Sequence, residues 1–178
     1  MKRALRTIGI VAVVVVAAFA YVHLAENKGY ALKLGSEAPG FRLPSIAGGD
    51  FDFASQRGKV VVLHFWATWC PPCVAELPSL ERLYRALGPA GLSVVTVSAD
   101  DDEAELRRFL SGRSLTLPVL RDAGGRVAWG QYRTTGYPET FVIDREGRLL
   151  EHVVGPEEWD SAERIAGLRR LLGNAPAR

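Results

Sequence analysis

Residues 60–73 read VVVLHFWATWCPPC, and this stretch decides the fold. Val60 to Trp66 form an almost unbroken apolar run, which predicts a strand buried on both faces of a sheet. Apolar residues then recur at helical spacing as far as Leu87, so we expect a helix that begins at Cys70. A buried strand followed at once by a helix that opens with a cysteine is therefore the centre of the prediction.

Further elements are predicted on both sides of this unit from alternation, turn residues and helical spacing. On the N-terminal side, strand pieces at 41–43 and 51–53 form a β-hairpin. After the central unit come a strand at 92–97, a helix capped by the aspartates at 100–102 and running to about 110, and a short strand at 117–120. A turn at 123–125, a short helix at 126–132, a hairpin of strands at 140–143 and 149–154, and a closing helix at 160–172 complete the chain. Strand-helix-strand units imply parallel pairing and hairpins imply antiparallel pairing, so the fold class is α/β with a mixed sheet.

Length and composition are those of one globular domain. The chain has 178 residues, of which 48% are hydrophobic and 24% charged, which excludes a disordered or collagen-like chain. Two cysteines are too few for a small disulfide-built scaffold. The net charge is only +2 and no basic stripe is interleaved with aromatic residues, so we expect no nucleic-acid partner.

The N-terminal sequence predicts a targeting segment. Residues 8–24 contain no Asp, Glu, Lys or Arg, and basic residues precede them. We interpret 1–26 as a signal anchor with two alternatives: a single-pass helix of the inner membrane, or a signal peptide cleaved after Ala20 that leaves a soluble periplasmic protein. Either alternative places the catalytic domain in the periplasm or another extracytoplasmic space. We expect a linker at 27–37, a folded domain at 38–173 and a tail at 174–178.

The pair Cys70 and Cys73 lies at the start of the predicted helix. The first helical N–H groups lack partners and the helix dipole is positive there, so a thiolate at Cys70 is stabilised. Pro71 suits the first turn, because its missing N–H costs nothing there. Cys73 follows one turn later and can resolve a mixed disulfide formed at Cys70, which predicts a two-cysteine redox cycle. Such a cycle needs no cofactor, since the electrons reside on the two sulfur atoms.

Other uses of the two cysteines fit less well. A structural disulfide across two residues closes a very small loop and constrains little. A zinc site needs four ligands, whereas the only histidines are His23, His64 and His152. Two thiolates do suit Cu(I), so a copper-handling protein is an alternative. A thiol-dependent peroxidase is another, although no Pro-x-x-x-Thr-x-x-Cys pattern occurs.

Two motifs carry a resemblance to a known family. The stretch at 62–73, followed by Glu-Leu-Pro at 76–78, and the stretch GYPETFVIDREG at 136–147 are similar to the membrane-anchored thioredoxin-like proteins of the TlpA/ResA/CcmG type. The resemblance covers about residues 35–172. It implies a thioredoxin fold, in which helices flank a central mixed β-sheet, with an inserted strand-helix segment near 92–110.

The resemblance also implies an activity and partners. Members are thiol:disulfide oxidoreductases outside the cytoplasm, and many reduce apocytochrome c, as in cytochrome c biogenesis, or copper-site proteins. A membrane thiol donor of the DsbD/CcdA type usually recharges them. For this chain we therefore expect a reductant of protein disulfides that works through a redox-active Cys-Pro-Pro-Cys disulfide.

Position by position, the resemblance assigns roles in the site. Cys70 corresponds to the exposed nucleophile and Cys73 to the resolving thiol. Pro138 corresponds to a cis-proline that faces the disulfide and would leave the backbone of Tyr137 free to pair with an extended substrate. A plain turn proline is the alternative. The supporting residues of the predicted site are Trp69, Pro71, Pro72, Glu76, His64, Tyr137 and Pro138.

Two acidic residues have alternative interpretations. Glu76 corresponds to a glutamate that tunes thiol acidity in related proteins, or it is a solvated acid near the positive end of the helix. Glu139 lines the substrate groove or is simply exposed.

His64 departs from the family pattern. Thioredoxins carry a buried aspartate at this strand position, and TlpA-like proteins often carry asparagine. An imidazole beneath the cysteine pair could act as the base for Cys73, whereas the alternative is a hydrogen-bonded core histidine. Among the tryptophans, we expect Trp69 to shield the disulfide, and Trp129 and Trp159 to close hydrophobic clusters.

Overall fold

The computed structural model describes residue 16 and residues 32–173. Except for residue 16, the predicted anchor at 1–26 lies outside the described residues. Of the predicted linker at 27–37, only residues 32–37 are described, and the predicted tail at 174–178 is not. In the part of the chain that is described, no helix is both long and apolar enough to cross a membrane.

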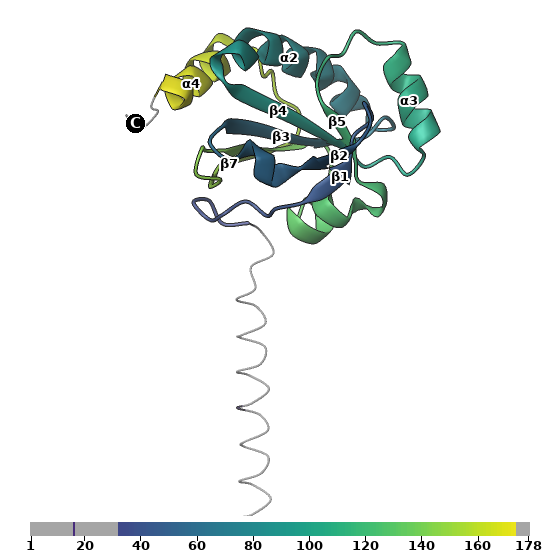
Figure 1. Ribbon diagram of the computed structural model, residues 1–178, viewed down its shortest axis with the longest axis horizontal. Coiled ribbons are helices and arrows are strands. Elements are labelled where there is room, and N and C mark those ends of the chain that lie inside the picture. The colour runs from purple at the N-terminus through teal and green to yellow at the C-terminus, as the bar shows by residue number, and fades with distance from the viewer. Residues whose placement is uncertain (1–15, 17–31, 174–178) are drawn as a thin grey trace, which may run out of the picture. The chain divides into compact units, whose positions relative to one another are not determined.

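A five-stranded mixed sheet forms the centre of the domain (Figure 1). Its strands are β3 (Val60–Trp66), β4 (Leu92–Ser98), β5 (Val119–Arg121), β6 (Glu139–Ile143) and β7 (Leu149–Val154). Across the sheet they lie in the order β5-β4-β3-β6-β7. The β3–β4 and β4–β5 pairs are parallel, whereas β3–β6 and β6–β7 are antiparallel. All seven residues of β3 are buried, as the apolar run predicts for a central strand.

The helices α2 (Pro71–Leu87) and α4 (Ala162–Gly173) cover one face of this sheet, whereas α3 (Glu103–Ser111) lies to the side of it (Figure 1). Leu80 and Leu83 of α2 pack with Val62 of β3 and Leu168 of α4 in one buried cluster. Removing this apolar surface from water fixes α2 against β3. The cysteines at the first turn of α2 are thereby held at the end of the central strand.

The opposite face carries the N-terminal hairpin and an aromatic cluster. The hairpin consists of β1 (Arg42–Pro44) and β2 (Asp50–Asp52), which pair antiparallel. Phe65, Tyr132 and Phe141 pack in the buried cluster of this face, with the rings of Phe65 and Tyr132 centred 5.1 Å apart. Because both faces of the sheet are covered, β3 contacts no water on either side.

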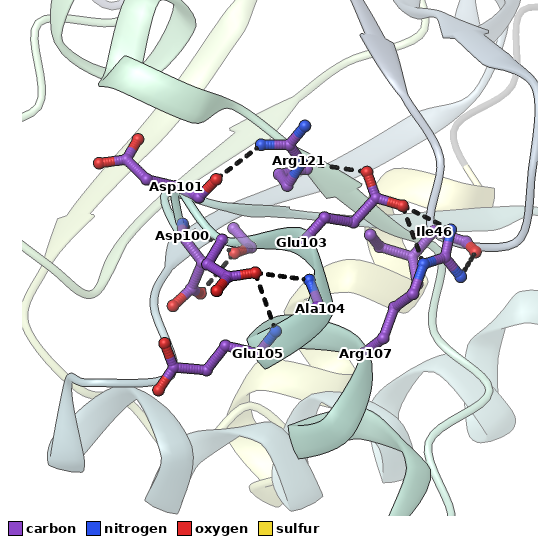
Figure 2. A network of polar contacts seen from close by, with 10 residues as sticks. Ile46, Asp100, Asp101, Glu103, Ala104, Glu105, Arg107 and Arg121 are labelled. Atoms are coloured by element: carbon purple, nitrogen blue, oxygen red, sulfur yellow. Dashed lines mark hydrogen bonds and ion pairs between the residues drawn. The ribbon is translucent and has the colours of Figure 1, made fainter.

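A polar network ties α3 to the sheet (Figure 2). Arg107 donates to Glu103 and to the carbonyl oxygen of Ile46, each at 2.8 Å. Arg121, at the end of β5, donates to the carbonyl oxygen of Asp101 at 3.0 Å and lies 3.5 Å from Glu103. The network joins α3 to the hairpin turn on one side and to the edge strand on the other.

The elements expected from the sequence are present, including the strand and helix at 92–110, which are β4 and α3. Two details are more specific than the prediction. Of the three consecutive aspartates, Asp102 caps α3 by accepting from the N–H of Ala104 at 2.8 Å. The short helix after the glycine turn is a π-helix, η4 (Arg126–Gln131), which the 3₁₀ turn η3 (Ala123–Gly125) precedes.

Candidate active site

The two cysteines form a disulfide at the N-terminus of α2. Their Cα atoms are 5.3 Å apart, and the N–H of Cys73 donates to Sγ of Cys70 at 3.4 Å. Pro71 and Pro72 fill the first two helical positions, so the N–H of Cys73 is the first one in the helix that can point at this sulfur. Cys70 is 6% exposed and Cys73 is fully buried. An incoming sulfur therefore reaches Cys70 first.

The loop between β3 and α2 is held by Asp100. Its carboxylate accepts from the N–H of Thr68 at 3.0 Å, from the hydroxyl of Thr68 at 2.5 Å and from the hydroxyl of Ser98 at 2.6 Å. Sequence reasoning placed Asp100 in a helix cap and missed this role. The acidic run at 100–102 gave no signal that its first member turns inward to the cysteine loop.

Tyr137 and Pro138 lie on the other side of the disulfide, and the bond between them is cis, as the resemblance implied. The carbonyl oxygen of Tyr137 is 3.5 Å from Sγ of Cys70. Among the described residues, no backbone hydrogen bond is formed by the N–H or the carbonyl oxygen of Tyr137. This stretch of backbone is therefore available beside the sulfur that an incoming partner would meet.

Glu139 holds the segment that precedes the proline. It is fully buried, so the interpretation of an exposed side chain is wrong. One carboxylate oxygen accepts from the N–H of Thr135 at 2.6 Å and from the N–H of Gly136 at 3.1 Å. The other oxygen lies 2.6 Å from Nε2 of His152 on β7. Because these bonds fix residues 135 and 136, they also position the backbone of Tyr137.

Two tryptophans flank the ring of Tyr137 at the surface. Trp69 is 63% exposed, and its ring centre is 5.9 Å from that of Tyr137 in an edge-on arrangement. Trp129 is 55% exposed and stacks on Tyr137 with centres 6.2 Å apart. The prediction that Trp129 closes a hydrophobic cluster is therefore wrong. In η4, Val127 and Ala128 occupy the buried face, and the side chain of the next residue, Trp129, faces outward.

Glu76 is buried in α2, at 4% exposure, so the interpretation of a solvated helix acid is wrong. The indole N–H of Trp159 donates to one carboxylate oxygen, and the other oxygen has no partner within the described residues. Burial raises the pKa of Glu76 to about 7, and the hydrogen bond from Trp159 opposes this rise only in part. Trp159 itself is fully buried, as predicted.

His64 is fully buried in the central strand. Its Nδ1 lies 2.9 Å from the hydroxyl oxygen of Thr140, and its Nε2 has no partner within the described residues. Side chains alternate along a strand, so His64 shares the α2 face of the sheet with Val62 and Trp66. Burial lowers the pKa of His64 to about 3, so the imidazole is neutral at physiological pH.

No metal centre is assembled in the part of the chain that the structure describes. No three side chains of His, Cys, Asp or Glu lie close enough there to hold an ion. His64 bonds to Thr140 and His152 to Glu139, so each has another partner. His23 lies outside the described residues.

Comparison with known proteins gives a consistent result. The sequence profile of the AhpC/TSA family matches residues 34–152. The thiol-disulfide oxidoreductase ResA of Bacillus cereus is 31% identical over 132 residues, which are 74% of this chain and 76% of that protein. A putative thiol:disulfide interchange protein DsbE from Chlorobium tepidum superposes with a TM-score of 0.74 at 31% identity, over 80% of this chain and 100% of that one. A secreted Mycobacterium tuberculosis disulfide oxidoreductase homologous to DsbE gives a TM-score of 0.62 at 30% identity, over 71% of this chain and 95% of that one.

Proposed function

The chain belongs to the AhpC/TSA family and is a thioredoxin-like thiol:disulfide oxidoreductase of the ResA and DsbE type, and on this premise we propose that it reduces disulfides of client proteins outside the cytoplasm. The observation that carries the proposal is the disulfide at the start of α2, in which Cys70 keeps an exposed edge and Cys73 is buried. This asymmetry supports Cys70 as the attacking sulfur and Cys73 as the resolving one.

The reaction is a pair of sulfur displacements. In the reduced chain, the thiolate of Cys70 attacks one sulfur of the client disulfide, forms a mixed disulfide and releases the other client thiolate. The sulfur of Cys73 then attacks Sγ of Cys70, which forms the Cys70–Cys73 bond and releases the second client thiolate. The client gains two electrons and two protons, and the chain is left oxidised.

The proton of Cys73 must leave before this sulfur can attack. We assign its acceptor to Glu76, one helical turn further along α2, because a carboxyl with a pKa of about 7 matches the operating pH. The sequence offered His64 either as this base or as a core histidine, and an imidazole whose pKa is about 3 takes up a proton poorly at neutral pH. We propose that His64 instead stays neutral and acts as a core residue of β3 bonded to Thr140.

The client would bind as an extended segment beside the disulfide. The free backbone of Tyr137 lies next to Sγ of Cys70, so a client strand that pairs with it would bring its own cysteine onto this sulfur. In this proposal Pro138 and Glu139 keep that backbone in place. Trp69, one residue before Cys70, presents an exposed ring beside that of Tyr137.

Location and partners follow from the predicted anchor. The apolar segment at 8–24 behind basic residues supports a domain tethered at the outer side of the inner membrane, and the secreted relative supports an extracytoplasmic place of work. We propose apocytochrome c or the thiols of copper-site proteins as clients. A membrane thiol donor of the DsbD/CcdA type would return electrons to the pair.

The reduction potential of the Cys70–Cys73 pair tests the direction of the proposal. The full chain is equilibrated in thiol redox buffers of graded potential, and its free thiols are trapped and counted by mass. A value of about −230 to −270 mV supports a reductant. A value near about −120 mV would mean that the chain installs disulfides, and the proposed direction would be wrong.

A further inference from the structure

Two exposed aromatic rings, those of Trp69 and Trp129, lie against the partly buried ring of Tyr137, whose hydroxyl is buried. The ring of Tyr137 lies between those of Trp69 and Trp129, with centres 5.9 Å and 6.2 Å away. Both tryptophans are more than half exposed, although large apolar side chains of a soluble domain are usually covered. Exposed aromatic rings at a site of association commonly supply binding energy.

We propose that Trp129 and Tyr137 receive the residues next to a client's reactive cysteine and select aromatic or large aliphatic side chains there. This inference rests on the proposed function and adds a client preference to it. The occupant is an extended segment of a client protein that carries such a side chain two residues from its cysteine.

The chemistry of exchange brings a client to the backbone of Tyr137. In the mixed disulfide, the client sulfur lies about 2 Å from Sγ of Cys70. Sγ of Cys70 is 3.5 Å from the carbonyl oxygen of Tyr137. The residues on either side of the client cysteine therefore lie near residue 137, whose ring contacts Trp129.

The spacing of the rings matches an extended chain. A strand advances about 3.3 Å per residue and returns its side chains to the same face at every second residue, a step of about 6.6 Å. The ring centres of Tyr137 and Trp129 are 6.2 Å apart. Client side chains two residues apart can therefore contact the two rings in turn.

Trp129 is held in place before any client arrives. Buried Asp122 accepts from the N–H of Val127 at 2.9 Å and from the N–H of Ala128 at 2.8 Å, which fixes the start of η4. The indole also lies close over Gly125, where a Cβ would meet the ring at 3.1 Å. A ring that its neighbours already hold in place loses little conformational entropy on binding. This favours a role of Trp129 in client recognition.

The test uses peptides whose single cysteine is joined by a disulfide to thionitrobenzoate. The thiolate of Cys70 in the reduced full chain attacks the peptide sulfur, so the peptide is transferred to Cys70 and coloured thionitrobenzoate is released. The peptides Gly-Gly-Cys-Gly-Phe-Gly, Gly-Gly-Cys-Gly-Lys-Gly and Gly-Gly-Cys-Gly-Gly-Gly differ only at the position two residues after cysteine. Second-order rate constants are measured in single turnover for the wild type and for Trp129→Ala, Trp129→Phe and Leu150→Ala.

We expect the phenylalanine peptide to react about fivefold faster than the other two with the wild type, the size expected for one aromatic pair. Trp129→Ala should bring this ratio to within about twofold of unity, and Trp129→Phe should keep most of it, since a ring remains. Leu150 is an exposed apolar residue of β7, and its replacement should leave the ratio at the wild-type value.

Two results would overturn the inference: equal rates for the three peptides with the wild type, or a preference that persists in Trp129→Ala. Both leave the proposed function intact, because exchange has occurred. Failure of the wild type to release thionitrobenzoate from any peptide would instead contradict the proposed function.

Discussion

Replacing Glu76 by glutamine tests whether the buried carboxyl of Glu76 is protonated in the folded chain. Glutamine keeps the oxygen that accepts from the indole of Trp159 and has nearly the same volume. It replaces the ionisable hydroxyl of the carboxyl by an amide NH2, which cannot lose a proton in this pH range. The variant therefore isolates the cost of ionising Glu76 in the folded chain from the cost of losing its packing.

The pH dependence of stability gives the magnitude. Burial raises the pKa of Glu76 from 4.5 to about 7, so in that range the native chain binds one proton more than the unfolded chain. Stability from this group is complete below pH 4.5 and is lost as the pH rises through about 7. At about 1.4 kcal/mol per pH unit, the free energy of unfolding of the wild type falls by about 3 kcal/mol. This decrease is absent in Glu76→Gln.

His64 changes the pH dependence of stability in the opposite direction, so its contribution must be separated from that of Glu76. Burial lowers its pKa from 6.5 to about 3, so between these values the unfolded chain binds the extra proton and stability rises with pH. The contributions of His64 and Glu76 therefore cancel in the wild type over much of the acidic range. The difference between Glu76→Gln and the wild type removes the histidine, which is common to both chains.

The assay is urea unfolding of the full chain, with the disulfide intact, at several values between about pH 4.5 and pH 8. The stability of Glu76→Gln relative to the wild type should be near zero at the acid end and rise to about 3 kcal/mol above pH 7. A difference that stays flat across this range would refute the reasoning, because it would mean that Glu76 is ionised in the folded chain.

Glu81 supplies a matched control on the same helix. It is also buried, but hydrogen bonds from Thr116, Arg85 and Leu117 outweigh its desolvation and lower its pKa. Its contribution is present above the unfolded pKa and is lost as the pH falls. Glu81→Gln should therefore be less stable than the wild type at neutral pH, the opposite sign to Glu76→Gln.

Three further predictions concern other parts of the site. Asp100→Ala should cost roughly 1–3 kcal/mol in urea unfolding, because the N–H of Thr68 loses its acceptor, whereas an unchanged midpoint would remove Asp100 from the loop's support. Cys73→Ser should accumulate a mixed disulfide between Cys70 and a client peptide, seen as an added mass on the intact chain; finding the same adduct in Cys70→Ser would reverse the assigned roles. His64→Asn should gain stability relative to the wild type as the pH falls below 6.5, and a parallel pair of stability profiles would contradict a neutral native histidine.

Local patterns were sufficient for the elements that carry the cysteines. The apolar run of β3 and the helical spacing of α2 are properties of neighbouring residues, so their positions could be read directly. The spacing predicted a helix that begins at Cys70, and the helix begins one residue later, at Pro71, with Cys70 as its N-cap. The cis bond before Pro138 was expected only from the family resemblance, because hydrophobic periodicity carries no information on peptide-bond isomers.

The environment of the acidic side chains depended on distant parts of the chain. Glu76 could be read as solvated because its burial requires Trp159, which arrives from the segment before α4. Asp100 looked like a helix cap because the sequence does not show that Thr68 lies beside it. Each assignment rests on a contact between residues more than thirty positions apart.

Trp129 shows the same limit for a surface residue. Its hydrophobicity favoured a buried position, yet η4 bonds the N–H of Tyr132 to the carbonyl oxygen of Val127 at 2.9 Å, five residues back. That spacing places Val127 and Tyr132 on the buried side and leaves Trp129 outside, stacked on Tyr137. The sequence by itself determined the strand, the helix and the reactive pair, because hydrophobic period and helix-end chemistry act over a few residues. The tertiary structure alone decided which polar groups are buried and which rings are exposed, because burial and pKa depend on neighbours that only folding brings together.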